Sequence, residues 1–403
     1  MALAPRADYL REVPPALTLH IYGDLHEIEP EWRRFERVAD CTAFQTFDWL
    51  SLWHRHIGRR EGARPAIVVG RFGDAETAFI VPLCVVPSPL ARRLCWLGQE
   101  LGDYNAPLLA PDFSERVDRD RFLSAWDDMQ VQMQRDPMLR FDWIEFEKMP
   151  QQVGAQVNPF SHLHITPNAS GAHLMHLGDD WETFYTAKRS SATRRRDRTK
   201  RRHLSEHGEI RFVTAADASD ARGTVETLME QKSRAFARKG IADIFARPGY
   251  REFFLDLVTD VNARRLVHVS RVDIGPCCAA TNLGVVYGDC YYHVLASYRH
   301  GAFSHYGPGA LHLRQLMAHA IGAGLKRFDF TIGDEPYKLE WCDTHIDLYD
   351  FAAAATWRGV PSLWSSTARR RIKRFIKQTP LAWRAVSSAR AAVGALTHPL
   401  RRS

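Results

Sequence analysis

Hydrophobic and polar positions along the first half of the chain follow the periods of strands and helices in a definite order. Alternating runs indicate strands, and runs with apolar residues three or four positions apart indicate helices. Glycine, proline and aspartate separate the runs. The predicted order is β-α-α-β-β-β-α-β. The runs that carry it are residues 17–23, 30–40, 47–58, 64–72, 75–86, 93–110, 119–136 and 141–149.

The second half of the chain repeats this order, which predicts two copies of one α/β unit. Residues 158–171, between the copies, are rich in Pro, Asn, Ser and Gly and lack periodicity, so we expect the boundary near residue 165. The predicted division is 1–165, 166–362 and a basic tail at 363–403. The runs of the second copy are residues 173–178, 181–208, 209–215, 219–240, 249–265, 267–298, 308–325, 326–332 and 346–357.

The composition is that of a globular chain with apolar material for one large or two ordinary cores. Of 403 residues, 45% are hydrophobic and 25% charged, which excludes disordered and collagen-like classes. The net charge of +7 favours an anionic partner without choosing among a phosphate-bearing cofactor, nucleic acid and a lipid surface. Seven cysteines with no C-x-x-C pair are typical of reduced cytosolic thiols, and no apolar run approaches the roughly 18 residues of a membrane span. We expect a cytoplasmic protein, either free or peripheral to the inner membrane.

A strand, a loop containing Pro-Gly and a helix follow one another in residues 289–317. The first N–H groups of a helix lack intrahelical partners and carry partial positive charge, so they bind phosphate oxygens. Gly307 and Gly309 would let a pyrophosphate approach the backbone closely. The alternative is an ordinary Pro-Gly turn before a surface helix. Neither a G-x-x-x-x-G-K-[ST] nor a G-x-G-x-x-G motif is present, so nucleotide hydrolysis and dinucleotide redox chemistry are not indicated.

Three segments of the chain resemble one family. The run YGPGALHLRQLMAHAIGAGLKRFDFTIGDEPYKLEWCD (306–343) resembles the C-terminal signature of the CelD-like (BcsL) cellulose-biosynthesis family of GNAT-type acyltransferases. FQTFDWLSLWHRHIG (44–58) and LCWLGQELGDYNAPLL (94–109) resemble its N-terminal segments. The resemblance covers about residues 40–350. It departs at Ala310-Leu311, where the family often has two aliphatic residues, and at Thr331, where it often has Gly or Arg.

The resemblance implies a tandem duplicated GNAT fold, with mixed central sheets flanked by helices and arranged as in Fem-type transferases. It also implies that the second copy binds acyl-CoA, most simply acetyl-CoA. The reaction would transfer the acyl group to an amine or hydroxyl of a sugar or amino-sugar acceptor in an exopolysaccharide or envelope pathway. On this reading the loop holds the CoA pyrophosphate through the backbone of Tyr306, Gly307, Gly309, Ala310 and Leu311.

Direct acyl transfer needs a base for the acceptor and an acid for the leaving thiolate. The candidates are Asp329 and His293 on adjacent predicted strands, followed by Tyr337 and Lys338. A histidine in a strand is often an ordinary core residue, an aspartate often bonds to backbone, and Lys338 can counter a phosphate. Asp103, Tyr104, Arg195 and Trp341 are the expected acceptor contacts. Histidine pairs elsewhere lack a completing Cys or carboxylate, so no metal is expected.

Two stretches are strongly basic. Residues 188–202 carry nine Lys and Arg, which suit either a solvated helix face or contacts to an anionic acceptor or donor phosphates. Fem-type relatives keep aminoacyl-tRNA open as an alternative donor, but the stretch lacks aromatics for stacking on bases, so a nucleic-acid partner is not expected. In the tail, six basic residues at 369–377 surround Ile372, Phe375 and Ile376, and Leu381 and Trp383 follow. Such a segment is either a membrane-surface helix, a docking helix or disordered. A catalytically silent membrane scaffold is the remaining alternative.

Overall fold

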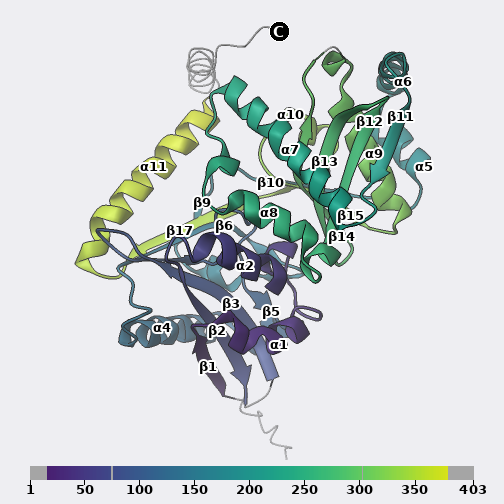
Figure 1. Cartoon of the computed structure of the whole chain (residues 1–403). Helices are drawn as coiled ribbons and strands as arrows, with labels where there is room; N and C mark the ends of the chain where they lie inside the picture. The colour runs from purple at the N-terminus through teal and green to yellow at the C-terminus, as the bar shows by residue number, and fades with distance from the viewer. Residues whose placement is uncertain (1–15, 74–75, 302, 380–403) are drawn as a thin grey trace, which may run out of the picture.

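Two mixed β-sheets, each covered by helices, organise the chain (Figure 1). The computed structural model describes residues 16–73, 76–301 and 303–379. The first sheet contains, from edge to edge, β1 (Leu17–Tyr22), β2 (Arg64–Phe72), β3 (Glu76–Val86), β4 (Arg93–Trp96), β6 (Trp143–Pro150), β17 (Leu348–Ala354) and β9 (Thr166–Pro167), and β5 (Leu108–Leu109) pairs with β3. β7 (Gln152–Val153) and β8 (Gln156–Val157) form a separate hairpin.

The strands of the second sheet follow the same order of antiparallel and parallel pairings as those of the first. It contains β11 (Ile210–Thr214), β12 (Val267–Ile274), β13 (Cys277–Tyr287), β14 (Cys290–Tyr298), β15 (Arg327–Ile332), β10 (Ala172–His176) and β16 (Thr344–Ile346). In each sheet one parallel pair, β4 with β6 or β14 with β15, lies among antiparallel neighbours. Each sheet also carries a β-bulge with a non-glycine residue at positive φ, Lys148 and Thr331, both at φ 58°. The repeated order predicted from the sequence is confirmed.

All strands of the second sheet lie, in sequence, between β9 and β17 of the first sheet. β9 lies at the edge of the first sheet and is followed at once by β10 in the second, whereas β16 lies at the edge of the second sheet and is followed by β17 in the first. β17 pairs antiparallel with β6, from Leu348 opposite Pro150 to Ala354 opposite Trp143. The expectation that residues 346–357 close the second copy is therefore wrong, because this strand completes the first sheet. The boundaries 1–165, 166–362 and 363–403 remain a prediction.

Helices cover both sheets. The first unit has α1 (Leu25–Phe35), α2 (Phe47–Trp53), which continues as a π-helix over His54–Gly58, α3 (Phe113–Arg116) and α4 (Arg119–Arg135). The second has α5 (Trp181–Lys188), α6 (Ser191–Ser205), α7 (Ala218–Lys239), α8 (Tyr250–Thr259), α9 (Pro308–Gly322) and α10 (Pro336–Leu339). Short 3₁₀ turns lie at Ala43–Gln45, Pro159–His162, Ile244–Ala246, Ala263–Leu266, Ser304–Tyr306 and Trp357–Gly359. α11 (Val360–Gln378) is the last described helix.

The predicted basic helical stretch of residues 181–208 is two helices. The first ends at Lys188, and Ser190 caps the second, because its hydroxyl accepts a hydrogen bond from the N–H of Thr193 at 3.2 Å. α6 carries most of the basic residues. Its position beside α9 is decided by packing, since Leu204 is buried against Leu311.

The predicted tail begins as a folded helix. α11 lies along the outer side of the first unit and packs on β17 and β6 (Figure 1). Ser366 donates a hydrogen bond to the fully buried carboxylate of Glu145 on β6. Leu381 and Trp383, predicted to extend the amphipathic segment, lie outside the described residues. No helix of the described part is both long and apolar enough to cross a membrane.

The two units share one hydrophobic core. Trp49 of α2 packs edge-on against Phe253 of α8 with ring centroids 5.1 Å apart, and Phe44 packs against Tyr292 of β14 at 5.7 Å. The backbones of the two units also approach each other closely at Gly249 and His56. A Cβ on Gly249 would lie 2.1 Å from the carbonyl oxygen of His56. The units therefore have a fixed relation, which places loops of the first against strands of the second.

Gly249→Ala tests this close approach. We expect it to lower the free energy of unfolding by about 2–4 kcal/mol, because the alanine would combine a clash with φ +87°. Denaturant titration measures the loss. Gly223→Ala is the matched control: Gly223 lies in α7 with open space around it, so alanine should stabilise by about 0.5–1 kcal/mol. Equal effects of the two substitutions would contradict the shared core.

Candidate active site

The two central parallel strands of the second sheet diverge. β14 and β15 pair only from Cys290 to Tyr292, opposite Arg327 to Asp329. Within the described residues no pairing joins them beyond this point, although β14 continues to Tyr298 along β13. The divergence leaves a wedge-shaped opening whose apex lies at Tyr292 and Asp329.

The corresponding opening of the first sheet is filled. The side-chain oxygen of Gln99 accepts a hydrogen bond from the N–H of Glu147 at 3.1 Å. The main-chain N–H of Asn105 donates to the carbonyl of Lys148 at 3.1 Å, and its side-chain amide donates to the carbonyl of Glu147 at 2.9 Å. The edge of β6 is thus occupied by the protein itself, so the second unit is the one whose strand edge can receive a ligand.

The Pro-Gly loop leads from β14 into α9 and leaves two amides free. Gly307 is the N-cap in a left-handed conformation (φ 71°), Pro308 has no N–H, and the first helical bond is donated by Leu311 to the carbonyl of Gly307 at 3.1 Å. The N–H groups of Gly309 and Ala310 therefore have no partner in the described part of the chain. The predicted contribution of the Tyr306 and Gly307 amides is not available, because they donate to Phe303 and Ser304 inside the preceding turn.

A side chain at position 309 would crowd Tyr298, which lies beside this loop. A Cβ there would lie 3.3 Å from Cδ1 of Tyr298, and Leu311 is buried below the loop. The end of the basic helix α6 is adjacent: His203 stacks on Tyr306 with ring centroids 4.9 Å apart. Arg195 is exposed on the same helix. Two free amides at the positive end of a helix dipole, with cations beside them, fit a diphosphate group.

Asp329 lies at the apex of the opening and is held by both units. The hydroxyl of Tyr104, in the loop after β4, lies 2.9 and 2.8 Å from the two carboxylate oxygens and donates to this carboxylate. The N–H of Thr331 donates to Oδ1 at 2.7 Å. Burial raises the pKa of Asp329 to about 7, although both hydrogen bonds lower it. A carboxyl with this pKa exchanges a proton near neutral pH.

Asp103, predicted as an acceptor contact, also lies at this contact between units. Burial raises its pKa, while Lys148 and a hydrogen bond from the Thr331 side chain lower it. Asp103 also raises the pKa of Asp329 through like-charge repulsion. Asp103, Tyr104 and Asp329 therefore form one cluster, as expected from their predicted place between the domains.

His293 lies on the opposite face of the sheet from Asp329. Its ring faces Phe328 and Phe330, with centroids 5.9 and 6.0 Å away. Burial first, and then the charges of Lys338 and Lys232, lower its pKa to about 3. The imidazole is therefore neutral at physiological pH and a weak base, which suits the core role left open by the sequence.

The Tyr337-Lys338 segment forms the short helix α10 beside β15. Lys338 is 4% exposed, and its ammonium donates to the carbonyl of Ile332 at 2.9 Å and pairs with Glu335 at 3.0 Å. Tyr337 is 39% exposed, and its ring centroid lies 6.1 Å from that of Phe330. Burial raises the pKa of the Tyr337 hydroxyl. Lys338 is thus fixed to the strand end, whereas Tyr337 is partly exposed beside Phe330.

Trp341 and Arg195 lie away from the apex cluster. Trp341 is buried in the core under α9, with the guanidinium of Arg189 4.7 Å above its ring and Tyr185 stacked at 6.3 Å. Their predicted contact with an acceptor remains a prediction.

Lys148 and Lys232 were missed by the sequence analysis. Lys232 of α7 donates to the carbonyl of Ala296 on the diverging part of β14 at 3.3 Å, and burial lowers its pKa. Lys148 donates to the carbonyl of Gly102. Both lysines occur in runs whose patterns are those of ordinary amphipathic elements, so no sequence signal distinguishes them.

A cavity of about 770 Å³ between the units ends at the apex. Its lining includes Thr42 and Tyr104 from the first unit and Tyr292, Asp329 and His345 from the second. Hydroxyl, carboxyl and imidazole groups are hydrogen-bonding partners for a polar ligand. The described residues contain no group of three or more His, Cys, Asp or Glu side chains that could hold a metal ion.

Comparison with known proteins supports the same picture. Residues 191–339 match the family described as Acetyltransferase (GNAT) domain. Among solved structures, FemX is similar with a TM-score of 0.56 and 10% identity, over 84% of this chain and 97% of that chain. A conserved protein of unknown function from Bacteroides thetaiotaomicron is similar with a TM-score of 0.52 and 8% identity, over 84% of this chain and 100% of that chain. No curated protein matches the sequence.

The chain therefore has a GNAT fold, with mixed sheets flanked by helices. The matched segment runs from α6 to α10 and contains the Pro-Gly loop, the diverging strands and Asp329. The acetyltransferase domain thus coincides with the unit whose strand edge is open. The similarity to FemX concerns the fold.

Asp329→Asn tests the raised pKa through stability. An unfolded aspartate titrates near pH 4, so between about pH 4 and 7 the folded state binds more protons and loses stability as the pH rises. The asparagine variant lacks this loss. We expect its free energy of unfolding, relative to the unmodified protein, to improve by roughly 2–4 kcal/mol between pH 4 and pH 8. Denaturant titrations at several pH values give the difference, and a pH-independent difference would contradict the assignment.

Proposed function

We propose that this protein is an acyltransferase that moves an acyl group, most simply acetyl, from acyl-CoA to an amine or hydroxyl of a sugar or amino-sugar acceptor. The observation that carries the proposal is the buried Asp329 carboxyl, with a pKa of about 7, where the diverging strands meet a cavity between the units. A general base works best when its pKa lies near the working pH.

The donor would bind at α9. The free amides of Gly309 and Ala310 suit the CoA diphosphate, and the cations of α6 add attraction for phosphate groups. The pantetheine arm would then follow the open edge of β14 toward the apex. This places the thioester next to Asp329 and leaves the cavity for the acceptor.

The reaction would proceed by direct transfer. The acceptor nitrogen or oxygen attacks the thioester carbonyl and forms the new C–N or C–O bond, while Asp329 takes its proton. The C–S bond breaks, and the leaving thiolate takes up a proton. Tyr337 is the candidate acid from the sequence motif; burial, which raises the pKa of its hydroxyl, makes it a weaker proton donor than a free tyrosine. Lys338 would position the strand end through Ile332, and His293 would shape the wall as a neutral ring.

Aminoacyl-tRNA remains a second candidate donor. The observation that favours it is the exposed basic face of α6 beside the Pro-Gly loop. A donor with many phosphates would lose affinity steeply as salt is added, whereas acetyl-CoA, with few phosphates, would lose much less. Titration of each donor at two salt concentrations distinguishes them.

The CelD-like family and a place at the inner membrane are parts of the same proposal. The motif segments support the family. Five apolar side chains of α11 and the turn before it are exposed, with arginines beside them, as in helices that lie on anionic membranes. They are Trp357, Val360, Trp364, Ile372 and Phe375. We place the enzyme in the cytoplasm, where an envelope or exopolysaccharide precursor would be modified.

Gly309→Val tests the donor site. The branched side chain would crowd Tyr298 and cover the two free amides, so we expect acetyl-CoA to bind at least about tenfold more weakly in calorimetric titration. Gly322→Val is the matched control on the same helix, because Gly322 has open space around it and should keep full affinity. Unchanged affinity in Gly309→Val would place the donor elsewhere.

Asp329→Asn also tests the base. On a panel of amino sugars and glycans, we expect kcat to fall by about 10²–10⁴-fold, and kcat/KM of the unmodified protein to rise with pH up to about 7. Tyr104→Phe should move this rise to higher pH. The hydrogen bond from Tyr104 lowers the pKa of Asp329, so its removal raises that pKa. Asp334→Asn, beyond the same strand, is the control and should keep both values. If the pH dependence of kcat/KM is the same in Tyr104→Phe as in the unmodified protein, Asp329 is not the base.

A further inference from the structure

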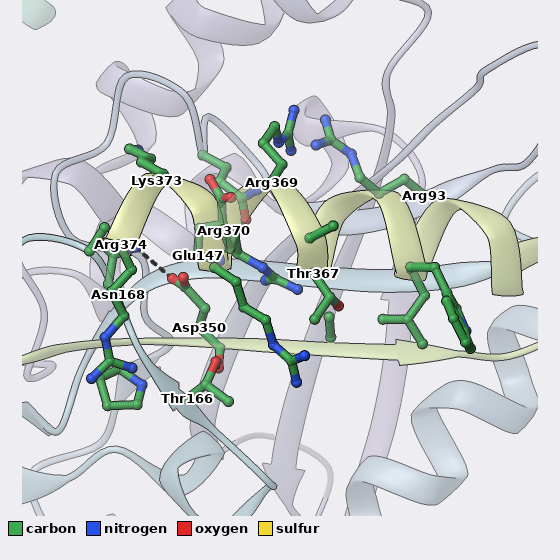
Figure 2. Close-up of a pocket in the computed structure, with 18 of the residues that line it drawn as sticks. Arg93, Glu147, Thr166, Asn168, Asp350, Thr367, Arg369, Arg370, Lys373 and Arg374 are labelled. Carbon is green, nitrogen blue, oxygen red and sulfur yellow. Dashed lines mark hydrogen bonds between the residues drawn. The ribbon is translucent and has the colours of Figure 1, made fainter. Parts of the chain in front are cut away.

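A second cavity, of about 1010 Å³, lies between α11 and the first sheet, away from the acetyltransferase domain (Figure 2). β4, β6, β9 and β17 supply its floor, and α11 supplies its roof. Sites for small ligands commonly enclose about 300–1,000 Å³, so this cavity has room for a ligand larger than a single phosphate. The acyl-transfer chemistry proposed above makes no use of it.

The roof of the cavity is strongly basic. Arg370, Arg371, Lys373 and Arg374 line it. Within the described residues none of the four lies within 4 Å of a carboxylate oxygen, and the charges of Arg370 and Lys373 lower the pKa of Asp350 opposite them. Nη1 of Arg370 is buried and has no hydrogen-bond partner there. A buried guanidinium nitrogen without a partner is costly, and it becomes favourable when a ligand supplies the acceptor. In Figure 2, α11 lies above β17, and the labelled side chains of Arg369 and Lys373 lie on the side of the helix away from that strand.

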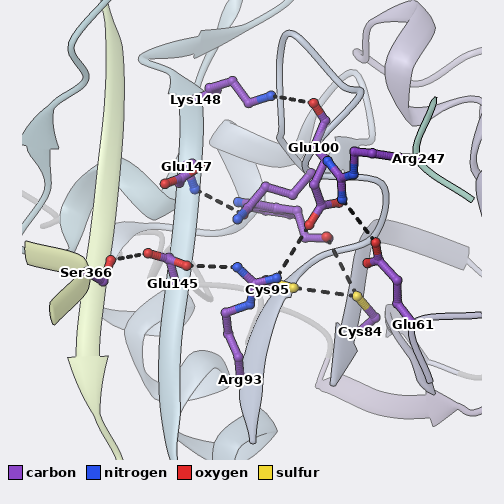
Figure 3. Close-up of polar contacts among 12 residues, drawn as sticks. Glu61, Cys84, Arg93, Cys95, Glu100, Glu145, Glu147, Lys148, Arg247 and Ser366 are labelled. Atoms are coloured by element: carbon purple, nitrogen blue, oxygen red, sulfur yellow. Dashed lines mark hydrogen bonds and ion pairs between the residues drawn. The ribbon is translucent and has the colours of Figure 1, made fainter. Parts of the chain in front are cut away.

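The roof is held rigidly over the floor. Glu145 of β6 is fully buried, accepts a hydrogen bond from Ser366 of α11 and pairs with Arg93 at 2.9 Å (Figure 3). Arg369 lies 3.6 Å from the same carboxylate. α11 is thus fixed by a buried charge network, so the cavity is a built feature of the first unit and the cations above it are already positioned.

The floor carries carboxylate, amide and hydroxyl groups instead of cations. Asp350 accepts hydrogen bonds from the side-chain amide of Asn168 at 2.7 Å and from the N–H of Lys148 at 3.1 Å. Glu147 and Thr166 also line this side. Carboxylate, amide and hydroxyl groups are the partners that sugar hydroxyls use. The cavity therefore pairs a cationic wall with a wall suited to neutral hydroxyl groups.

We propose that this cavity binds a phosphate ester that also carries hydroxyl groups, with the phosphate on Arg370 and Lys373 and the hydroxyls on the Asp350 side. Arginine and lysine at one wall match the charge of the phosphate. A free phosphosugar and a phospholipid headgroup share this chemistry. The inference is independent of the donor and base assigned above, because it concerns the other unit and its own lining residues.

The experiment uses the full chain and two probes. Glucose 1-phosphate is titrated calorimetrically, and sedimentation is measured with phosphatidylcholine vesicles that contain or lack phosphatidylglycerol. We expect at least one probe to bind and Arg370→Gln with Lys373→Gln to weaken that binding about tenfold or more. Binding of the sugar phosphate identifies a soluble ligand. Binding only of phosphatidylglycerol vesicles identifies a lipid headgroup.

Arg358→Gln is the matched control, because it removes one exposed positive charge just before α11, outside the cavity lining. It should keep the binding of the unmodified protein. Circular dichroism of each variant confirms that α11 stays folded, and acetyl-CoA titration shows that the second unit is intact. Failure of both probes to bind, or equal losses in Arg358→Gln and in the double variant, would overturn the proposal whether or not acetyl-CoA binds.

Discussion

The return of the chain to the first sheet through β17 is the constraint on which the molecule depends. The first sheet takes β9 and β17 from the later part of the chain, whereas the second sheet is built wholly from the consecutive strands β10 to β16, residues 172–346. The covalent crossings at β9–β10 and β16–β17, together with the shared aromatic core, fix one orientation of the units. That orientation is what brings the hydroxyl of Tyr104 to the carboxyl of Asp329.

Two copies of one fold have diverged in physical role. In the first copy, Gln99 and Asn105 use up the hydrogen-bonding edge of β6, and that copy contributes Tyr104 and Asp103 to its neighbour. In the second copy, the pairing of β14 with β15 stops at Tyr292 and Asp329 in the part of the chain that the structure describes. A duplicated unit can lose its ligand opening in this way and still be needed, because it buries and tunes the carboxyl of the other.

The order of elements followed from periodicity, and the Pro-Gly loop followed from residue type. The partner of β17 did not, because a strand's alternation shows which face is buried and not which sheet it joins. Tyr104 and Asp329 were separately recognisable, but their contact spans 225 positions and depends on the packing of the two units on one core. Thr331 illustrates the reverse case: the resembling family often has glycine or arginine there, and the positive φ of 58° explains the glycine. Lys232 and Lys148 matter through burial and contacts, which no local pattern records.

Burial explains why the pKa of Asp329, like that of Glu36 in the lining of the same cavity, lies near neutrality. Tyr104 and Thr331 donate to Asp329, and such bonds alone would keep it ionised as an ordinary acid. The desolvation imposed by the neighbouring unit outweighs them, and Asp103 adds repulsion, so the pKa rises toward neutrality. The same contact that holds the units together therefore makes the carboxyl able to exchange a proton. The ionised form of Asp329 is therefore destabilised where the opening between β14 and β15 meets the cavity between the units. Shifted pKa values of this kind are common at functional sites.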